Sequence, residues 1–284
     1  MLEGSLNMVL GAGISFLFLS LMFSPLERAF PARNQDLFRP AWKTDLCFFF
    51  GQYLLWGGLV LALLSLAQET ITSILPLWLS RGVKQQPFWL QAGEAVLFGD
   101  LLIYWVHRFQ HSNSVLWRFH SVHHTAEHLD WLAAHREHPV DGLLTQFIIN
   151  LPAFVLGFPI ETLSLLVAFR GLWAIYIHSN VKIPLGPLKL LIGAPELHHW
   201  HHSLDRTHCN FANLSPLMDI LFGTYVCPGS EPESYGVRPA QPQAYLSQLA
   251  YPFRIKKVSR RHIEGAETKS PSSESVDLSL SALE

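Results

Sequence analysis

Histidine is the residue type whose number and spacing in this chain could support chemistry. Fourteen of the 15 histidines lie between His107 and His208. Eight of them form one His-x3-His pair and two His-x2-His-His sets, namely His107 and His111; His120, His123 and His124; and His198, His201 and His202. Positions i, i+3 and i+4 share one helix face, so each cluster is expected to point in one direction. Neutral imidazole binds iron, zinc, copper and nickel. Because eight ring nitrogens exceed the roughly four ligands of one zinc site, the count predicts two metal ions.

A carboxylate shares a predicted helix with the first pair. One stripe of that helix holds Asp100, Tyr104, His107 and His111. An Asp inside an apolar helix is costly unless it has a partner. We therefore expect Asp100 to orient a metal-binding histidine through a hydrogen bond, with packing against another helix as the alternative.

The composition is that of a membrane protein. Of the 284 residues, 49% are hydrophobic and 15% are charged, whereas soluble domains carry roughly 25% charged residues. The mean hydropathy is +0.22. The net charge of -2 does not favour a nucleic-acid partner. Cys47, Cys209 and Cys227 lack the spacing of a zinc or redox motif and predict no disulfide framework.

Apolar stretches predict an all-α, multi-pass integral membrane protein. Three expected spans are Leu6–Met22, Leu46–Ala67 and Phe88–Val106, each close to the roughly 20 residues that a bilayer requires. The first stretch could be a signal peptide, but its leading residues carry no Lys or Arg. The loop between the first two spans is rich in Arg and Lys, which places it on the cytoplasmic side. Gln68–Pro87 is expected to be an interfacial loop on the opposite side.

A fourth apolar stretch, Leu143–Ile177, is too long for one straight span. Gly157, Phe158 and Pro159 offer a turn in its middle, which predicts a helical hairpin that enters and leaves on one side. Only an even number of crossings keeps all three histidine clusters on the same, cytoplasmic face. Arg170 in the second arm is expected to face protein.

The chain is expected to have three parts. Residues 1–90 would form membrane helices and loops, residues 91–227 the catalytic domain, and residues 228–284 a cytoplasmic tail. Within the tail, the basic run from Arg254 to Arg261 is expected to mark the cytoplasmic side. The Ser-rich segment Glu264–Glu284 is expected to be disordered.

Six motifs in order resemble the fatty acid hydroxylase/sterol desaturase superfamily. They are DLLIYWVHR (residues 100–108), LWRFHSVHH (116–124), REHP (136–139), HSN (178–180), ELHHWHH (196–202) and DILFGTY (219–225). The resemblance covers less than half of the chain. The short interval between the first two clusters is similar to the hydroxylase branch rather than to the acyl-chain desaturases.

The resemblance implies a di-iron centre at the cytoplasmic face. The implied ligands are the eight clustered histidines, with His138 and His178 as further ligands. His199 falls outside the repeated frame and is expected to support the ligands without binding metal. His128, His135 and His208 match less securely.

The resemblance also implies that the centre uses O2 to open a C–H bond of a lipid substrate, such as a sterol or fatty acyl chain, by hydroxylation or desaturation. The sequence contains no Gly-x-Gly-x-x-Gly fingerprint, so we expect electrons to come from a separate redox protein.

Two alternatives to the oxygenase remain open. One is a zinc-dependent membrane hydrolase, since imidazole alone does not separate zinc from iron. The other is a histidine-rich metal transporter, in which histidines would line a path through the spans.

Overall fold

The computed structural model describes residues 2–158, 160–206 and 208–254. The chain divides into two units, Met1–Pro252 and Phe253–Glu284. Only two residues of the second unit, Phe253 and Arg254, are described. Beyond Arg254, the basic run and the predicted disordered end lie outside the described residues. The division of the chain at residues 90 and 227 stays a prediction.

The first unit is helical, and its described residues form no β-strand. Two isolated bridges pair Pro31 with Val181 and Ser203 with Tyr235. The helices are α1 (Leu2–Ala29), α2 (Trp42–Gly51), α3 (Gly57–Ile74), α4 (Leu77–Lys84), α5 (Phe88–Ser112), α6 (Ser114–His120), α7 (Pro139–Leu156), α8 (Ile160–His178), α9 (Pro195–His201), α10 (Leu217–Leu221) and α11 (Tyr245–Ala250). A π-helical turn over Gln52–Trp56 joins α2 to α3.

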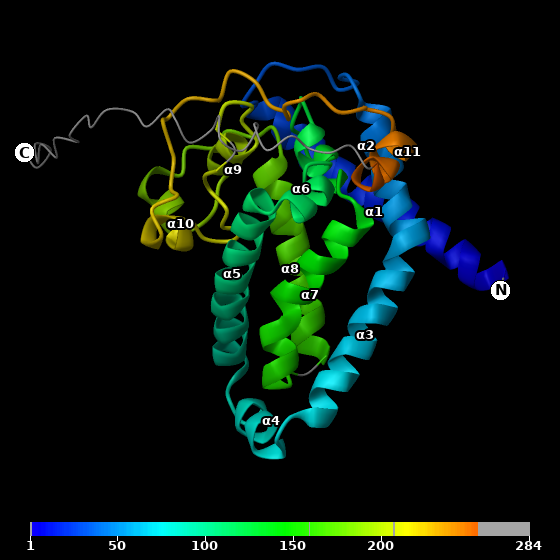
Figure 1. The fold of residues 1–284 in the computed structure, drawn as a ribbon, viewed down its shortest axis with the longest axis vertical. Helices are drawn as coiled ribbons and strands as arrows, with labels where there is room; N and C mark the ends of the chain where they lie inside the picture. The colour runs from blue at the N-terminus through cyan, green and yellow to red at the C-terminus, as the bar shows by residue number, and fades with distance from the viewer. Residues whose placement is uncertain (1, 159, 207, 255–284) are drawn as a thin grey trace, which may run out of the picture. The chain divides into compact units, whose positions relative to one another are not determined.

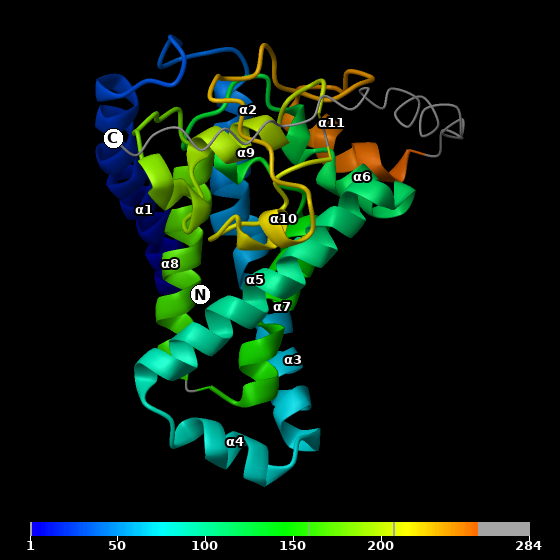
Figure 2. The same ribbon diagram turned by 90° about the vertical axis from the view of Figure 1, so that its left-hand side faces the viewer.

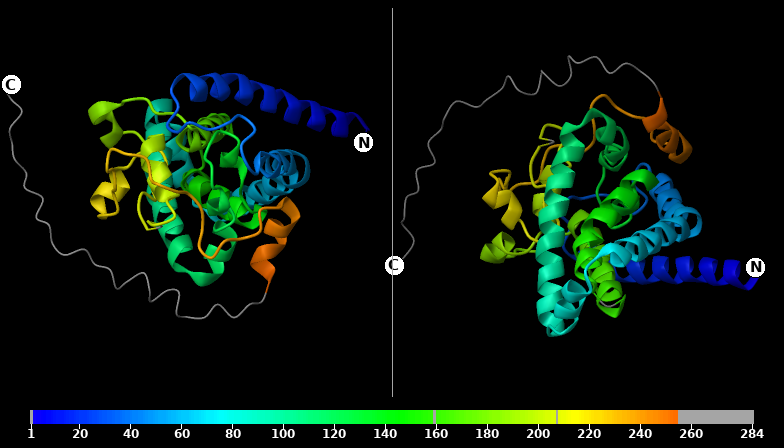
Figure 3. Two further views of the ribbon diagram at one scale, coloured as in Figure 1. Left: turned by 90° about the horizontal axis from the view of Figure 1, so that it is seen from above. Right: turned by 60° about the horizontal axis from the view of Figure 1, so that its bottom comes forward.

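The long helices α3, α5, α7 and α8 form a bundle, with α4 joining α3 to α5 at one end (Figures 1 and 2). Helix α7 packs against both α5 and α3. The short helices α6 and α9, with their loops, lie at the other end of the bundle (Figure 2). Seen from above, the start of α1 extends away from the other helices (Figure 3). The bundle therefore presents one end on which chain segments from α5 to α9 meet.

The predicted hairpin is confirmed. Helix α7 ends at Leu156 and is capped by Gly157, whose positive φ of 67° suits glycine. The Gly157 amide closes the helix on the carbonyls of Ala153 and Phe154. Helix α8 then returns to the end of the bundle where α7 began (Figure 1). The hairpin thus brings the segments before α7 and after α8 to the same end.

Three helical segments are long and apolar enough to cross a membrane among the described residues. They are Leu6–Ala29, Trp42–Ile74 and Pro139–Leu156, and Leu165–His178 is a shorter apolar helix. The first two contain the expected spans, although both helices extend further. The region Gln68–Pro87 is not the loop that we expected, because α3 continues to Ile74 and α4 follows.

Helix α5 contains the expected third span but is not among the apolar candidates. Polar residues along the helix lower its mean hydropathy, and three of them, Gln91, Asp100 and Gln110, are buried. Its outer side exposes large apolar residues, including Trp89, Phe98 and Phe109. Helix α5 therefore buries several polar side chains while it exposes large apolar ones.

Candidate metal centre

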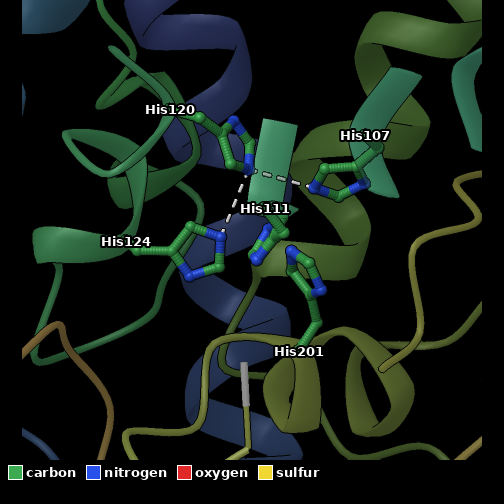
Figure 4. Close-up of side chains that lie close together, drawn as sticks. All are labelled: His107, His111, His120, His124 and His201. Atoms are coloured by element: carbon green, nitrogen blue, oxygen red, sulfur yellow. Dashed lines mark hydrogen bonds between the residues drawn. The ribbon is translucent and has the colours of Figure 1, made fainter. Parts of the chain in front are cut away.

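Nine buried or half-buried histidines converge at the end of the bundle where α6 and α9 lie. They form a first group of His107, His111, His120, His124 and His201, and a second group of His123, His178, His198 and His202. Within each group, one nitrogen per ring lies within 4.8 Å of the others. Figure 4 shows the first group, in which rings from α5, α6, α9 and the turn after α6 face a common centre. Segments nearly 100 residues apart thus supply one group.

The two His-x2-His-His clusters are each divided between the groups, which corrects the expectation that each cluster points in one direction. His120 and His124, four positions apart, join the first group, while His123 joins the second. In the last cluster, His198 and His202 join the second group and His201 joins the first. Adjacent residues on a helix point about 100° apart, because a turn takes 3.6 residues. Each cluster therefore contributes to two neighbouring sites.

The spacing of the ring nitrogens fits two metal ions. In the first group, Nε2 of His120 lies 3.0 Å from Nε2 of His107 and 3.3 Å from Nε2 of His124. In the second group, Nε2 of His178 lies 2.9 Å from Nε2 of both His123 and His198. Nitrogens that bind one ion at roughly 2.0–2.1 Å lie about 3.0–3.4 Å apart in octahedral or tetrahedral arrangements. Both groups match this spacing.

Backbone carbonyls fix the orientation of several rings from outside. The Nδ1 atoms of His107, His123 and His201 lie 2.8, 3.0 and 2.7 Å from the carbonyl oxygens of Phe211, Arg136 and Cys209. His178 contacts the carbonyl of Ala174 in the same way. A carbonyl oxygen only accepts, so each Nδ1 carries the proton and donates. The unprotonated Nε2 of each ring is left as a potential metal ligand.

Several ring nitrogens are buried without a hydrogen-bond partner among the described residues. They include both nitrogens of His111, Nε2 of His201, and Nδ1 of His124, His198 and His202. A buried polar atom without a partner costs about 1–3 kcal/mol. A bound ion removes this cost for Nε2 of His201 and for one nitrogen of His111, so the donor set of the first group fits a metal.

Burial keeps these imidazoles neutral. It is the main cause that lowers the pKa of His124, His198, His201 and His202 well below the usual value, and neighbouring histidines lower the pKa further. Neutral imidazole is the form that binds metal.

Asp141 is a supporting residue that the sequence interpretation missed. Its Oδ2 accepts a hydrogen bond from Nδ1 of His120 at 2.9 Å, and its Oδ1 accepts one from Nε2 of Gln110 at 2.6 Å. Asp141 lies in the first turn of α7 and is buried. The sequence contains a signal, because Asp141 lies two residues after the REHP motif. Spacing along one helix, however, does not show contact between α6 and α7.

Asp100 does not contact a histidine, which corrects its expected role. It forms a buried ion pair with Arg170, with 3.1 Å between Oδ1 and Nη1. The same contact confirms that Arg170 faces protein. Helices α5 and α8 run side by side, so the two buried charges satisfy each other.

His138 lies outside both groups. Its Nδ1 accepts a hydrogen bond from the Val140 amide at 3.1 Å and caps α7, while its Nε2 donates to the Leu249 carbonyl at 3.2 Å. Both nitrogens are therefore occupied, so we correct its expected role as a ligand.

His199 also lies outside the groups. Its Nδ1 lies 2.7 Å from Oε2 of Glu231, and its Nε2 lies 3.1 Å from the Ser179 carbonyl. These contacts anchor α9 to the segments on either side, so His199 supports its neighbours without facing a metal position.

The DILFGTY motif supports the site from a distance. Asp219 accepts hydrogen bonds from the amides of Phe211 and Ala212 at 2.8 and 2.9 Å. These bonds hold the segment whose Phe211 carbonyl orients His107. Thr224 of the motif also hydrogen-bonds Tyr104 on α5, at 2.9 Å between the hydroxyl oxygens.

Comparison with known proteins finds relatives over the part of the chain that contains both histidine groups. The family model described as fatty acid hydroxylase matches residues 94–224. The ornithine lipid hydroxylase OlsE of Rhizobium tropici is 31% identical over 189 residues, which cover 65% of this chain and 56% of the relative. The alkylglycerol monooxygenase of Danio rerio is 32% identical over 50% of this chain and 32% of the relative. The Delta(7)-sterol 5(6)-desaturase ERG3A of Gibberella zeae is 30% identical over 47% and 37%.

These similarities identify the chain as a member of the fatty acid hydroxylase/sterol desaturase superfamily. The matches span about a third to just over half the length of these relatives. No solved structure was found to match the chain.

Proposed function

We propose that this protein is a membrane-bound di-iron oxygenase that hydroxylates or desaturates a C–H bond of a lipid. The observation that carries the proposal is the convergence of nine imidazoles into two adjacent groups. The relatives described above, namely an ornithine lipid hydroxylase, an alkylglycerol monooxygenase and a sterol desaturase, support the reaction class.

Each histidine group would hold one iron ion. The iron pair, when bound, supplies the activation of O2 that an unreactive alkyl C–H bond requires, because such a bond has no acidic proton and no leaving group. The chain holds the imidazoles in place through the Phe211, Arg136, Ala174 and Cys209 carbonyls and the Asp141 carboxylate. Neutral ligands leave the charge of the ions uncancelled, and the buried rings exclude water.

The geometry favours this reaction over hydrolysis and transport. A catalytic zinc ion uses about three protein ligands and keeps one position open, whereas the groups here offer five and four imidazoles. A transporter would place histidines along its spans. Here they gather at one end of the bundle, on α6 and the turn that follows it, at the end of α9, and towards the ends of α5 and α8.

The surface supports a lipid environment. Leu21 on α1, Leu61 on α3 and Phe98 on α5 are among the exposed large apolar residues. We infer that the bundle crosses the membrane several times, that the metal centre lies on its cytoplasmic side, and that the substrate arrives from the bilayer. Electrons would come from a separate redox protein that docks on that side.

The test is metal stoichiometry, measured on protein purified in detergent without oxygen or chelator. Two irons per chain are expected, followed by oxidation of lipid substrates when a reductase system is added. Two zinc ions that resist exchange for iron would overturn the oxygenase in favour of hydrolysis. Absence of tightly bound metal would also contradict the proposal.

Matched variants assign the ions to the groups. His111→Ala removes a ring of the first group, and His202→Ala removes one of the second. Each is expected to weaken its own ion and abolish turnover. His208→Ala, which lies near His111 but outside both groups, is the control and should retain both ions.

A further inference from the structure

A cavity of about 70 Å³ lies between the start of α3 and the start of α7. Its polar lining comes from Gln52, Glu137 and Gln146, and its apolar lining includes Phe48, Trp56 and Val60. A site for one water requires roughly 10–15 Å³, so the cavity has room for a small polar group.

The backbone is shaped to make this cavity. The π-helical turn Gln52–Trp56 lies on one side, and such turns occur often at functional sites. Gly142 lies on the other side, where an added Cβ would come 2.6 Å from Oε2 of Glu137. Glycine at this position therefore leaves space for the carboxyl group.

The cavity lies next to residues that hydrogen-bond histidines of both groups. Glu137 follows Arg136, whose carbonyl accepts the hydrogen bond of His123 at 3.0 Å. Glu137 also lies four residues before Asp141. The Oδ2 atom of Asp141 accepts a hydrogen bond from Nδ1 of His120 at 2.9 Å. A molecule in the cavity would thus lie next to the segments that position the metal ligands.

Glu137 has no structural task that explains its position. It is half-buried and makes no hydrogen bond or ion pair within the described residues. Burial, reinforced by Asp141, raises the pKa of Glu137 to about 8. A half-buried carboxyl group that faces a cavity and lacks a partner suits a ligand that supplies the missing hydrogen bond.

We propose that this cavity binds the polar end of the lipid substrate, and that this end is a hydroxyl or amide group rather than a phosphate or carboxylate. The proposal rests on the lipid oxygenase function proposed above and adds the substrate class to it. Glu137 accepts the hydrogen bond of the hydroxyl or N–H. The side-chain oxygens of Gln52 and Gln146 already lie 3.3 Å from Nδ1 of His135 and 3.4 Å from Nδ2 of Asn150, so their amide nitrogens are the groups that can donate to the ligand. Phe48, Trp56 and Val60 contact the first carbons of the alkyl chain.

The lining of the cavity offers no positive charge to an anionic lipid headgroup. No Lys or Arg lines the cavity in the part of the chain that the structure describes. The nearest candidate by sequence, Arg136, is committed to a buried ion pair with Asp45. A phosphate placed beside the Glu137 carboxyl would meet no compensating cation, and burying an unpaired charge is costly.

The first experiment compares lipids that share a hexadecyl chain, namely hexadecylglycerol, hexadecanamide, palmitate and hexadecyl phosphate, on the iron-loaded full chain. Hexadecylglycerol and hexadecanamide should be oxidised, and the two anions should not. Glu137→Leu should raise the KM for hexadecylglycerol about three- to tenfold through loss of one hydrogen bond. Glu137→Gln, which keeps an acceptor, should remain within about twofold of the original, and Glu233→Leu on the exposed surface is the control.

The second experiment does not depend on turnover. A hydrophobic carbodiimide, which modifies protonated carboxyl groups in apolar surroundings, should label Glu137 in the purified protein. Hexadecylglycerol should protect it and hexadecyl phosphate should not, as read by peptide mass spectrometry. Gly142→Ala, which pushes the carboxyl group out of place, should reduce protection while leaving the helix intact.

The two experiments distinguish failure of the cavity proposal from failure of the oxygenase proposal. Turnover that proceeds equally with all four lipids, or is unchanged by Glu137→Leu, would overturn the cavity and leave the oxygenase standing. Labelling of Glu137 that hexadecylglycerol does not prevent would also overturn it. Protection without oxidation of any lipid would support the cavity and contradict the oxygenase.

Discussion

Asp141 provides the sharpest test of how the chain builds its metal centre. Its carboxylate is buried and binds Nδ1 of His120 on one oxygen and Gln110 on the other. In Asp141→Asn the size is conserved but one oxygen becomes an amide nitrogen. If that nitrogen faces His120, the ring must carry its proton on Nε2 and cannot bind metal there. If the oxygen faces His120, Gln110 must turn its own oxygen towards the new amide, and the bond to His120 becomes neutral and weaker.

The magnitude follows from this geometry. Loss of a partner of this kind costs about 10–100-fold in metal affinity, which corresponds to about 1.4–2.8 kcal/mol. The loss should be confined to the first group, because no histidine of the second group contacts Asp141 among the bonds of the described residues. We therefore expect one ion to bind more weakly and the other to be retained.

Competition with a chelator under anaerobic conditions measures the two affinities on the detergent-purified protein. The matched control is Glu231→Gln, because Glu231 contacts Nδ1 of His199 at 2.7 Å in the same manner. His199 lies outside both groups, so this variant should keep both affinities. Equal losses in the two variants, or none in Asp141→Asn, would refute the assigned role of Asp141.

Three further predictions concern stability. His138→Ala should lower the free energy of unfolding by about 1 kcal/mol through loss of the α7 cap, while the metal content stays unchanged; a fall in metal content would restore His138 as a ligand. Asp100→Leu should cost about 3–5 kcal/mol because it leaves Arg170 buried and unpaired, and Asp100→Leu with Arg170→Leu should cost less; both are read as Tm in detergent. The metal-free protein should keep its stability above about pH 6.5 and lose it as the pH falls, because unfolded histidines bind protons near that value while burial holds the pKa of His124 and of His198 well below it in the fold. A Tm that does not change from pH 8 to pH 5 would contradict this.

The sequence predicts the histidines of the metal centre better than it predicts the residues that hydrogen-bond them. Spacing alone selects the eight clustered histidines, all of which the structure brings into the two groups. Spacing could not show that His123 and His124 serve different groups, because α6 ends at His120 and the following turn sets their directions. Nor could it choose between Asp100 and Asp141 as the supporting carboxylate, since that choice depends on which helices are neighbours.

The hairpin shows which long-range features can be deduced from a sequence. The requirement that the clusters share one side of the membrane demands an even number of crossings between them, and Gly157 supplies the turn. The same requirement does not state which residues of α7 and α8 meet their neighbours. Those contacts depend on side chains from different helices, and they decide that Arg170 reaches Asp100 on α5 and that Asp141 reaches His120 on α6. Buried polar residues in a membrane protein must find partners, but the sequence reveals only that a partner exists.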